Sequence, residues 1–303
     1  MSEPAGLWSA SHWIVGPGAL GRLIGLRLAA SIPVTLVGRR PLPAGQVLIT
    51  PEGDTLARQL TTTSLDALPD IKPDVVHLTT KAYAAESAHA ALVPHLPPGT
   101  PLVLWQNGFA CQPRLGERHA GPVLCATTTE GAYVQGDDRM THAGHGETRI
   151  GALGGGHVHL AQALAQTLTR AGLPAWAVDD IHTRLWHKLA VNAAINPLVA
   201  RFRIRNGQLR DRPFRPLVET VIAEIAAIMA AEQIPPPPRG WRDLVWRVVA
   251  GTARNRASML QDVLAGRPTE RAAILGPLLE AAHRHGLSSP LLVELDDALS
   301  HHG

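Results

Sequence analysis

The sequence predicts an α/β chain in which a unit built on a parallel sheet is followed by an all-helical unit. Short apolar runs alternate with amphipathic helical stretches up to about residue 178, and alternation of this kind favours a parallel sheet covered on both faces. From about residue 180 onward no run has the pattern of a strand. A length of 303 residues suits two domains, and we place them at residues 1–179 and 180–303.

The first strand is expected at His12–Val15, and a glycine-rich turn, Gly16–Gly21, follows it directly. The apolar residues of Leu20–Leu28 then recur at helical spacing on one face, which predicts the first helix. The next strand is expected at Pro33–Val37 and ends at Gly38.

Two further buried strands are expected at Asp74–Thr79 and Pro101–Trp105, with the helical stretch Ala82–Leu96 between them. The segments Gln46–Thr63 and Val123–Ile150 have an extended pattern broken by turns. We expect both of them to add antiparallel strands to the far edge of the same sheet.

The remaining chain is expected to be mostly helical. Leu160–Ala171 is amphipathic and should return to the sheet, where Pro174–Val178 supplies a last edge strand. Farther on, Pro235–Pro238 predicts a stiff loop between helices. One helical stripe is formed by Val218, Ile222, Ile225 and Met229.

Charge and hydropathy exclude two classes of partner. Lys and Arg number 28 against 25 Asp and Glu, a net charge of +3 that is too small and too scattered for a nucleic-acid binder. The basic run Arg201, Arg203 and Arg205 is expected to be a solvated helix end or loop rather than a phosphate-binding stripe. No uninterrupted apolar run reaches the ~18 residues of a membrane span. The early apolar stretch Leu20–Ile32 is broken by Arg22 and Arg27 and has no basic segment before it, so we expect no signal peptide and a cytoplasmic protein. The leader Met1–Ser11 carries no motif.

Cysteine and histidine spacing argues against a metal centre. Two cysteines, Cys111 and Cys125, are expected to be buried free thiols rather than a disulfide or part of a zinc site. The pairs His157–His159 and His283–His285 have a suitable spacing, but no carboxylate or cysteine is placed to complete either set. We therefore expect no metal.

The run Gly16-Pro17-Gly18-Ala19-Leu20-Gly21 has the spacing of a dinucleotide-binding loop. An ordinary glycine-rich turn is the alternative, but the run joins a predicted strand to a predicted helix. In that context the first glycine permits the turn, the second lets the backbone approach a pyrophosphate, and the third lets the helix pack on the strand. The helix N-terminus then offers N–H groups to the anion. The sequence thus predicts a Rossmann-type domain.

The end of the second strand indicates which dinucleotide binds. A site for NAD carries an acidic residue there for the ribose 2′-hydroxyl, whereas this chain has Val37-Gly38-Arg39-Arg40. A guanidinium pairs with a 2′-phosphate that a carboxylate would repel. We therefore predict NADPH, with the contacting arginine left open and Arg39 favoured because it is nearer the strand end.

Lys188, Asn192 and Asn196 are spaced i, i+4, i+8 and so share one stripe of a predicted helix. The alternative is a solvated polar stripe. Asparagine is a weak helix former, which an exposed stripe would rarely use twice. Pro197 also interrupts the helical hydrogen bonding at this point, and such an interruption can mark a functional site.

Taken together, the motifs resemble those of the ketopantoate reductase family in order along nearly the whole chain. The run from Lys188 onward and the segments after it are more specific than the glycine loop, which many dehydrogenases share. The motifs are Gly16–Gly21, Thr80-Lys81-Ala82, Gln106-Asn107-Gly108, Lys188–Asn192, Asn196-Pro197-Leu198, Ser258–Asp262 and Gly266–Glu270.

The resemblance implies NADPH-dependent reduction of 2-dehydropantoate to pantoate, a step of pantothenate and coenzyme A biosynthesis. It implies that Lys188 is the general acid at the keto oxygen and that Glu270 assists it. The implied substrate-binding residues are Asn107, Asn192, Asn196, Asn255 and Ser258. The implied cofactor-binding residues are Lys81, Asn107 and Glu270, in addition to Gly16–Gly21, Arg39 and Arg40.

Two alternatives remain open. One is a related reductase of another small 2-keto acid, because polar contacts of this kind do not fix the length of the substrate. The other is a catalytically silent NADP(H)-binding sensor, whose mark would be the loss of Lys188 or Glu270, and both are present. A monomer and a homodimer are equally compatible with the sequence.

Overall fold

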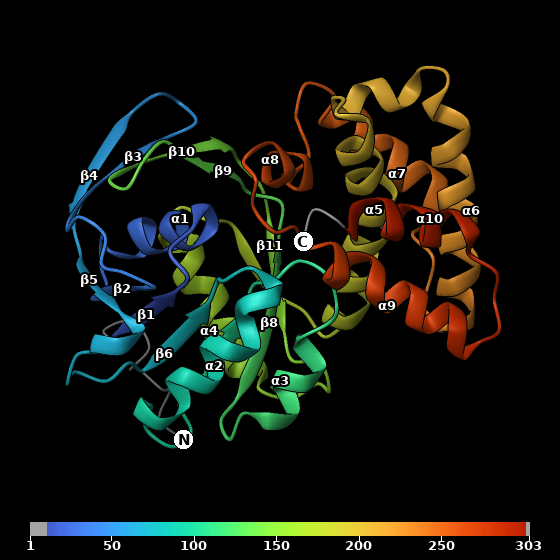
Figure 1. Ribbon diagram of the computed structural model, residues 1–303. Helices are drawn as coiled ribbons and strands as arrows, with labels where there is room; N and C mark the ends of the chain where they lie inside the picture. The colour runs from blue at the N-terminus through green and yellow to red at the C-terminus, as the bar shows by residue number, and fades with distance from the viewer. Residues whose placement is uncertain (1–10, 301–303) are drawn as a thin grey trace. The chain divides into compact units, whose positions relative to one another are not determined.

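The structure, a computed structural model, describes residues 11–300, so the leader up to residue 10 lies outside the described part. The chain forms two compact units (Figure 1). One contains the chain up to Gln106 together with Cys111–His182, and the other contains Asn107–Ala110 together with the chain from Thr183. A short segment from the first half of the sequence therefore belongs to the second unit.

The first unit is built on an eight-stranded sheet. Neighbouring strands are parallel except β8 and β11, which are antiparallel. Every residue of β1, β2, β6 and β7 is buried, as expected when both faces are covered. In spatial order the strands are β12 (Ala175–Ala177), β11 (Thr148–Gly151), β8 (Val123–Thr128), β7 (Leu102–Leu104), β6 (Val75–Leu78), β1 (His12–Val15), β2 (Val34–Gly38) and β5 (Thr61–Ser64).

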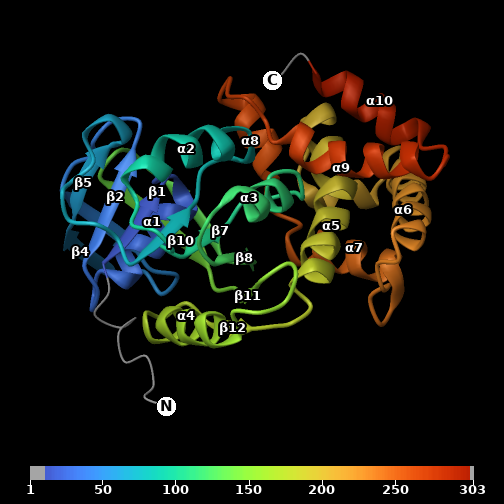
Figure 2. The same cartoon turned by 90° about the horizontal axis from the view of Figure 1, so that it is seen from below.

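Helices cover this sheet. They are α1 (Ala19–Leu28), α2 (Ala85–Leu92), α3 (Gln112–Arg118) and α4 (Val158–Arg170), with short 3-10 turns at Leu65–Ala67, Ala82–Ala84 and Val93–His95. Figure 2 shows α2 and α3 on one side of the sheet and α4 on the other. On α1, Leu23 and Ile24 are buried in the core between helix and sheet. The predicted Rossmann-type α/β arrangement is confirmed.

A second sheet in the same unit corrects one expectation. Its strands in spatial order are β4 (Thr55–Gln59), β3 (Gly45–Ile49), β10 (Arg139–Gly144) and β9 (Gly131–Val134). We expected Gln46–Thr63 and Val123–Ile150 to extend the far edge of the main sheet with antiparallel strands, and this is wrong for most of their length. Only β11 is antiparallel there, while β5 and β8 join the main sheet in parallel.

The small sheet lies against α1. Arg22 of α1 bonds the loop between β9 and β10 of that sheet. The Arg22 Nη1 donates to the carbonyl oxygen of Gly136 at 2.7 Å, and its Nε donates to the carbonyl of Pro17 at 3.0 Å. Burial alternates along β3, so only one of its faces needs cover. Alternation of this kind predicts a strand but not the sheet to which it belongs.

The second unit is helical throughout its described residues. Its elements are α5 (Ile181–Phe202), a 3-10 turn (Asn206–Arg210), α6 (Phe214–Ala231), α7 (Gly240–Gly251), α8 (Ser258–Leu264), α9 (Arg271–Arg284) and α10 (Pro290–Leu299). The predicted stripe on α6, which includes Val218 and Met229, is buried in the core of this unit. Pro235–Pro238 lies between α6 and α7, as predicted. Pro197 does not end α5, which continues for another five residues to Phe202.

Cys111 and Cys125 are buried free thiols, as expected, and burial raises the pKa of Cys125 to about 12. Between residues 11 and 300, none of the helices combines the length and the apolar character needed to span a bilayer.

Candidate active site

The order of strands reverses next to β1. From β1 the chain proceeds outward through β2 and β5, then returns to β6 on the other side and continues through β7 and β8. The C-terminal ends of β1 and β6 are adjacent, with Val15 opposite Leu78. Ligands of open α/β sheets bind at such a reversal point. The glycine loop follows β1, and Thr79–Lys81 follow β6.

The three glycines of the loop differ in what surrounds them. Gly16 has φ +91°, and a Cβ there would lie 2.6 Å from the backbone nitrogen of Thr80. At Gly21 a Cβ would lie 2.5 Å from Thr79 Oγ1. At Gly18, by contrast, the nearest heavy atom would be 4.0 Å away, so this glycine borders open space at the start of α1. The loop is therefore packed at its two ends and open in the middle, which fits a pyrophosphate against the helix N-terminus.

Two residues to which sequence reasoning gave no role hold the glycine loop and the segment after β6 in place. The Thr79 hydroxyl donates to the carbonyl of Gly16 at 2.8 Å. The Gln106 amide donates to the carbonyls of Leu78 and Thr80 at 2.8 and 3.3 Å. The signal that could have found both is a polar side chain within two residues of the end of a buried strand, where the neighbouring loops leave carbonyls to be bonded.

Both arginines after β2 are exposed, but only Arg40 forms an ion pair within residues 11–300. Arg40 donates from Nη2 to both carboxylate oxygens of Asp137, at 2.8 and 2.7 Å. Arg39 forms no ion pair with any residue in the 11–300 range. Arg39 is therefore available to an anionic ligand, whereas Arg40 already has a counter-charge.

In the helical unit, Lys188, Glu270 and Asn107 form one electrostatic group. Lys188 lies in the middle of α5, and Glu270 is the buried residue that precedes α9. The Asn107 amide donates to Glu270 Oε2 at 3.2 Å. The backbone N–H of Phe109 donates to the carbonyl of Ala273 at 3.2 Å, which fixes the Asn107 segment to α9.

The pKa of the Lys188 ammonium is shifted from its usual value. Burial lowers the pKa of Lys188 to about 8, and the charge of Glu270 opposes that effect by favouring the protonated form. A lysine with a pKa near 8 can release its proton close to neutral pH, which suits a general acid. Perturbed pKa values of this size concentrate at functional sites.

Asn192 and Asn196 occupy the next two turns of α5 on the Lys188 side. Asn196 is buried, at 7% exposure, and Asn192 is partly buried. Neither side-chain amide forms a hydrogen bond with another residue in the described chain. Both amides therefore keep donors and an acceptor that a ligand could use.

Asn255 and Ser258 lie in the same unit but are not joined to this group. Asn255 is exposed in the loop after α7, and its carbonyl accepts from the N–H of Asn206 at 3.0 Å. Ser258 is exposed as the first residue of α8. The structure thus brings together Asn107, Lys188 and Glu270, and it leaves Asn255 and Ser258 without a direct bond to them.

A histidine group other than His157–His159 and His283–His285 has ligand atoms close enough together to hold an ion. In residues 11–300, ligand atoms of Glu130, His142 and His145 lie within 4.8 Å of one another. Arg27 can only donate to His142 Nδ1, at 3.1 Å, so His142 Nε2 carries the proton and donates to Glu130 Oε2 at 2.6 Å. Because both nitrogens of His142 are already engaged, this arrangement fits a buried hydrogen-bond network better than a metal site.

Comparisons with known proteins were made for sequence and structure. The family model described as "Ketopantoate reductase PanE/ApbA" matches residues 13–155, and "Ketopantoate reductase PanE/ApbA C terminal" matches residues 180–301. The 2-dehydropantoate 2-reductase of Vibrio cholerae is 35% identical over 283 residues, covering 92% of this chain and 93% of that protein. The enzyme of Pyrococcus horikoshii is 30% identical over 285 residues, covering 92% and 93%.

Solved structures share the fold over almost the full length. The 2-dehydropantoate 2-reductase of Methylococcus capsulatus aligns with a TM-score of 0.83 at 25% identity, covering 96% of each chain. A D-mandelate dehydrogenase bound to NADH and anilino(oxo)acetate aligns with a TM-score of 0.87 at 21% identity, covering 96% of this chain and 97% of that one. The second similarity describes the fold alone.

Proposed function

Since the chain belongs to the ketopantoate reductase family, we propose that it reduces 2-dehydropantoate to pantoate in the route to pantothenate and coenzyme A. The observation that carries the proposal is the group formed by Lys188, Glu270 and Asn107, with the unbonded amides of Asn192 and Asn196 on the same helix as the lysine. This group supplies a proton donor and hydrogen-bonding groups for a small 2-keto acid.

The cofactor of the proposed reaction is a nicotinamide dinucleotide, and NADPH is the form we propose. Gly16–Gly21 and the start of α1 would hold its pyrophosphate, and Arg39 would pair with its 2′-phosphate. Lys81, which follows β6 at the reversal point, is a third proposed contact, and Asn107 and Glu270 are two more. When bound, the reduced nicotinamide supplies a hydride to the keto carbon.

The side chains of the helical unit would complete the reaction. As negative charge develops on the keto oxygen, the Lys188 ammonium stabilises it and then donates its proton. Glu270 keeps Lys188 protonated, because its charge raises the pKa that burial lowers. The amides of Asn192, Asn196 and Asn255 and the hydroxyl of Ser258 would hold the hydroxyl and carboxylate groups of the substrate.

The test is NADPH oxidation by the purified protein against a panel of 2-keto acids that includes 2-dehydropantoate and an aryl 2-keto acid. We expect 2-dehydropantoate to give the highest kcat/KM. A higher value for another member of the panel would move the assignment to that acid. A protein that binds NADPH and reduces no member of the panel would overturn the enzymatic proposal in favour of a sensor.

The proposal includes a cytoplasmic enzyme that acts as a monomer or a homodimer. A ketopantoate reductase of Staphylococcus aureus with this fold is described as dimeric. Sedimentation of the purified chain at assay concentration would distinguish the two states.

A further inference from the structure

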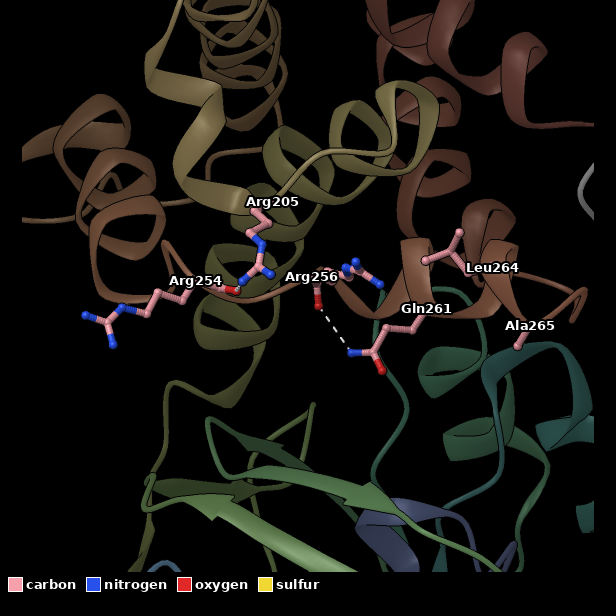
Figure 3. Close-up of a pocket in the computed structure, with 6 residues that line it drawn as sticks. All are labelled: Arg205, Arg254, Arg256, Gln261, Leu264 and Ala265. Atoms are coloured by element: carbon pink, nitrogen blue, oxygen red, sulfur yellow. Dashed lines mark hydrogen bonds between the residues drawn. The ribbon is translucent and has the colours of Figure 1, made fainter.

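Two groups of arginine side chains differ in what they face. In the helical unit Arg205, Arg254 and Arg256 line an open pocket, but Figure 3 shows the Arg254 side chain directed away from the other two, so the three do not converge on one ligand. In the first unit the guanidinium groups of Arg22 and Arg40 both bond to one short segment, the loop between β9 and β10. That loop therefore carries a defined arrangement of charge beside the end of β2.

Buried donors hold this loop, residues 135–138, in a fixed position. The carbonyl oxygen of Gly136 accepts from Arg22 Nη1 at 2.7 Å, and that of Asp137 accepts from Gln46 Nε2 at 2.9 Å. Arg22 is 5% exposed and Gln46 is 1% exposed. Releasing either carbonyl would leave a buried donor unsatisfied, which is costly, so the backbone that carries the Asp137 carboxylate stays in place.

The same arginine ties this loop to the glycine loop. Arg22 Nε donates to the carbonyl oxygen of Pro17 at 3.0 Å, while its Nη1 bonds Gly136. The end of β2 packs against the same proline, since a Cβ at Gly38 would lie 3.4 Å from Pro17 Cγ and 2.7 Å from the carbonyl oxygen of Arg40. The three segments therefore meet at the end of β2, where Rossmann-type domains select between the two nicotinamide dinucleotides.

Asp137 brings an acid to that point from a distant part of the sequence. Its two carboxylate oxygens accept from Arg40 Nη2 at 2.8 and 2.7 Å. Sites for NAD have an acidic residue at the end of the second strand. Here the strand itself has no such acid, and the small sheet supplies one that is 97 positions from Arg40 in the chain. A carboxylate repels a 2′-phosphate, and this one also occupies a guanidinium that could pair with the phosphate.

The ion pair is exposed, so a ligand can compete with it. The side chains of Arg40 and Asp137 are 62% and 49% exposed, and exposed pairs contribute little free energy. With the carboxylate in place, Arg39 alone is available to a 2′-phosphate. Without it, Arg40 would be available as well. NADH carries no 2′-phosphate, so its binding should not depend on this competition.

We propose that Asp137 is a specificity-determining residue of the cofactor site, which weakens the preference for NADPH over NADH by engaging Arg40. The inference rests on the cofactor proposed above, because it assumes that the 2′-phosphate lies at the end of β2. It adds a residue of the small sheet to a selection that the strand end was expected to make by itself.

The experiment is a fluorescence titration of the full chain with NADPH and with NADH, in the absence of any keto acid. Asp137→Asn should strengthen NADPH binding roughly three- to tenfold and leave NADH binding unchanged, because one exposed ion pair is gained and one repulsion is removed. High salt should reduce this gain, since it screens exposed charges. The double variant of Asp137→Asn with Arg40→Ala should lose most of the gain.

Two further variants make the result specific. Asp138→Asn removes a carboxylate of the same loop that forms no ion pair within residues 11–300, and it should change NADPH binding less. Asp137→Glu keeps the charge within reach of Arg40 and should show no gain. These side chains are exposed, so the melting temperature should stay constant.

The outcomes separate this inference from the proposed function. An unchanged ratio of the two dissociation constants in Asp137→Asn, or an equal gain in Asp138→Asn, would overturn the role of Asp137 and leave the proposed reaction intact. A chain that binds neither dinucleotide would overturn both.

Discussion

The glycine loop of the first unit and the polar stripe of the helical unit, which is Lys188, Asn192 and Asn196 on α5, would bind their ligands in different ways. Around Gly16 and Gly21 the backbone itself is shaped, because a Cβ at either position would collide with Thr79 or Thr80. On α5 the backbone is ordinary helix, and the chemistry depends on the side chains of Lys188 and Asn196. The comparison teaches that changes in the first region should alter cofactor binding, whereas changes in the second should alter turnover.

The largest expected effect is on turnover, with cofactor binding unchanged. Lys188→Ala removes the proposed proton donor, so kcat should fall by roughly 10²–10⁴-fold while the Kd for NADPH stays unchanged. Steady-state kinetics and fluorescence titration of NADPH measure the two quantities. The matched control is Lys72→Ala, which removes an exposed lysine of the first unit. A Lys188→Ala protein with near-normal kcat would remove the proposed mechanism.

Cofactor preference gives the next largest effect. Arg39→Ala should weaken NADPH binding by roughly 10- to 100-fold and leave NADH binding unchanged, because only NADPH carries the 2′-phosphate. Arg40→Ala should have a smaller effect, since Arg40 is already paired with Asp137. Titration of both variants with both dinucleotides is the measurement. Equal loss in the two variants would contradict the distinction between the arginines.

A methyl group within the loop should have a moderate effect on binding. At Gly18→Ala the new Cβ would occupy the open space proposed for the pyrophosphate, so we expect NADPH affinity to fall about tenfold, or about 1.4 kcal/mol, with no change in melting temperature. Gly16→Ala should lower the melting temperature as well, because φ +91° and Thr80 both oppose a side chain. Thermal unfolding beside NADPH titration tests the pair, and unchanged affinity in Gly18→Ala would argue against a pyrophosphate at this loop.

The smallest expected effect is a displacement of the pH profile. A general acid works in its protonated form, so kcat/KM should fall as pH rises through about 8, the pKa of Lys188. Because Glu270 raises that pKa, Glu270→Gln should move the fall in activity to lower pH. Glu280→Gln, on the exposed side of the same helix α9, is the control. A profile that does not move in Glu270→Gln would contradict this coupling.

The sequence predicted those parts of the fold that depend on nearby residues. The strand, loop and helix of residues 12–28 follow from local spacing, and so do the stripe on α6 and the register of Lys188 and Asn196 on α5. The small sheet was not predictable in the same way. Its strands β3 and β10 are about 90 residues apart in the chain, and alternation within one strand carries no information about a distant partner.

The candidate site shows the same limit. Asn107 follows a strand of the first unit, yet the structure assigns it to the helical unit, where it bonds Glu270. The resemblance to the family implied a role for both residues, but their spacing in the sequence gave no reason to expect a hydrogen bond between them.

The burial of Lys188 has a consequence for thermostability. Its pKa is lowered from 10.5 to about 8 in the folded chain, so folding disfavours the charged form. That cost is fully present below pH 8 and diminishes as pH rises toward 10.5, where the unfolded chain also loses the proton. Replacing the lysine by an uncharged side chain of similar length, as in Lys188→Met, should therefore raise the melting temperature at neutral pH while lowering kcat as Lys188→Ala does. Selection for heat resistance alone would then favour loss of Lys188, and only selection for activity would retain it.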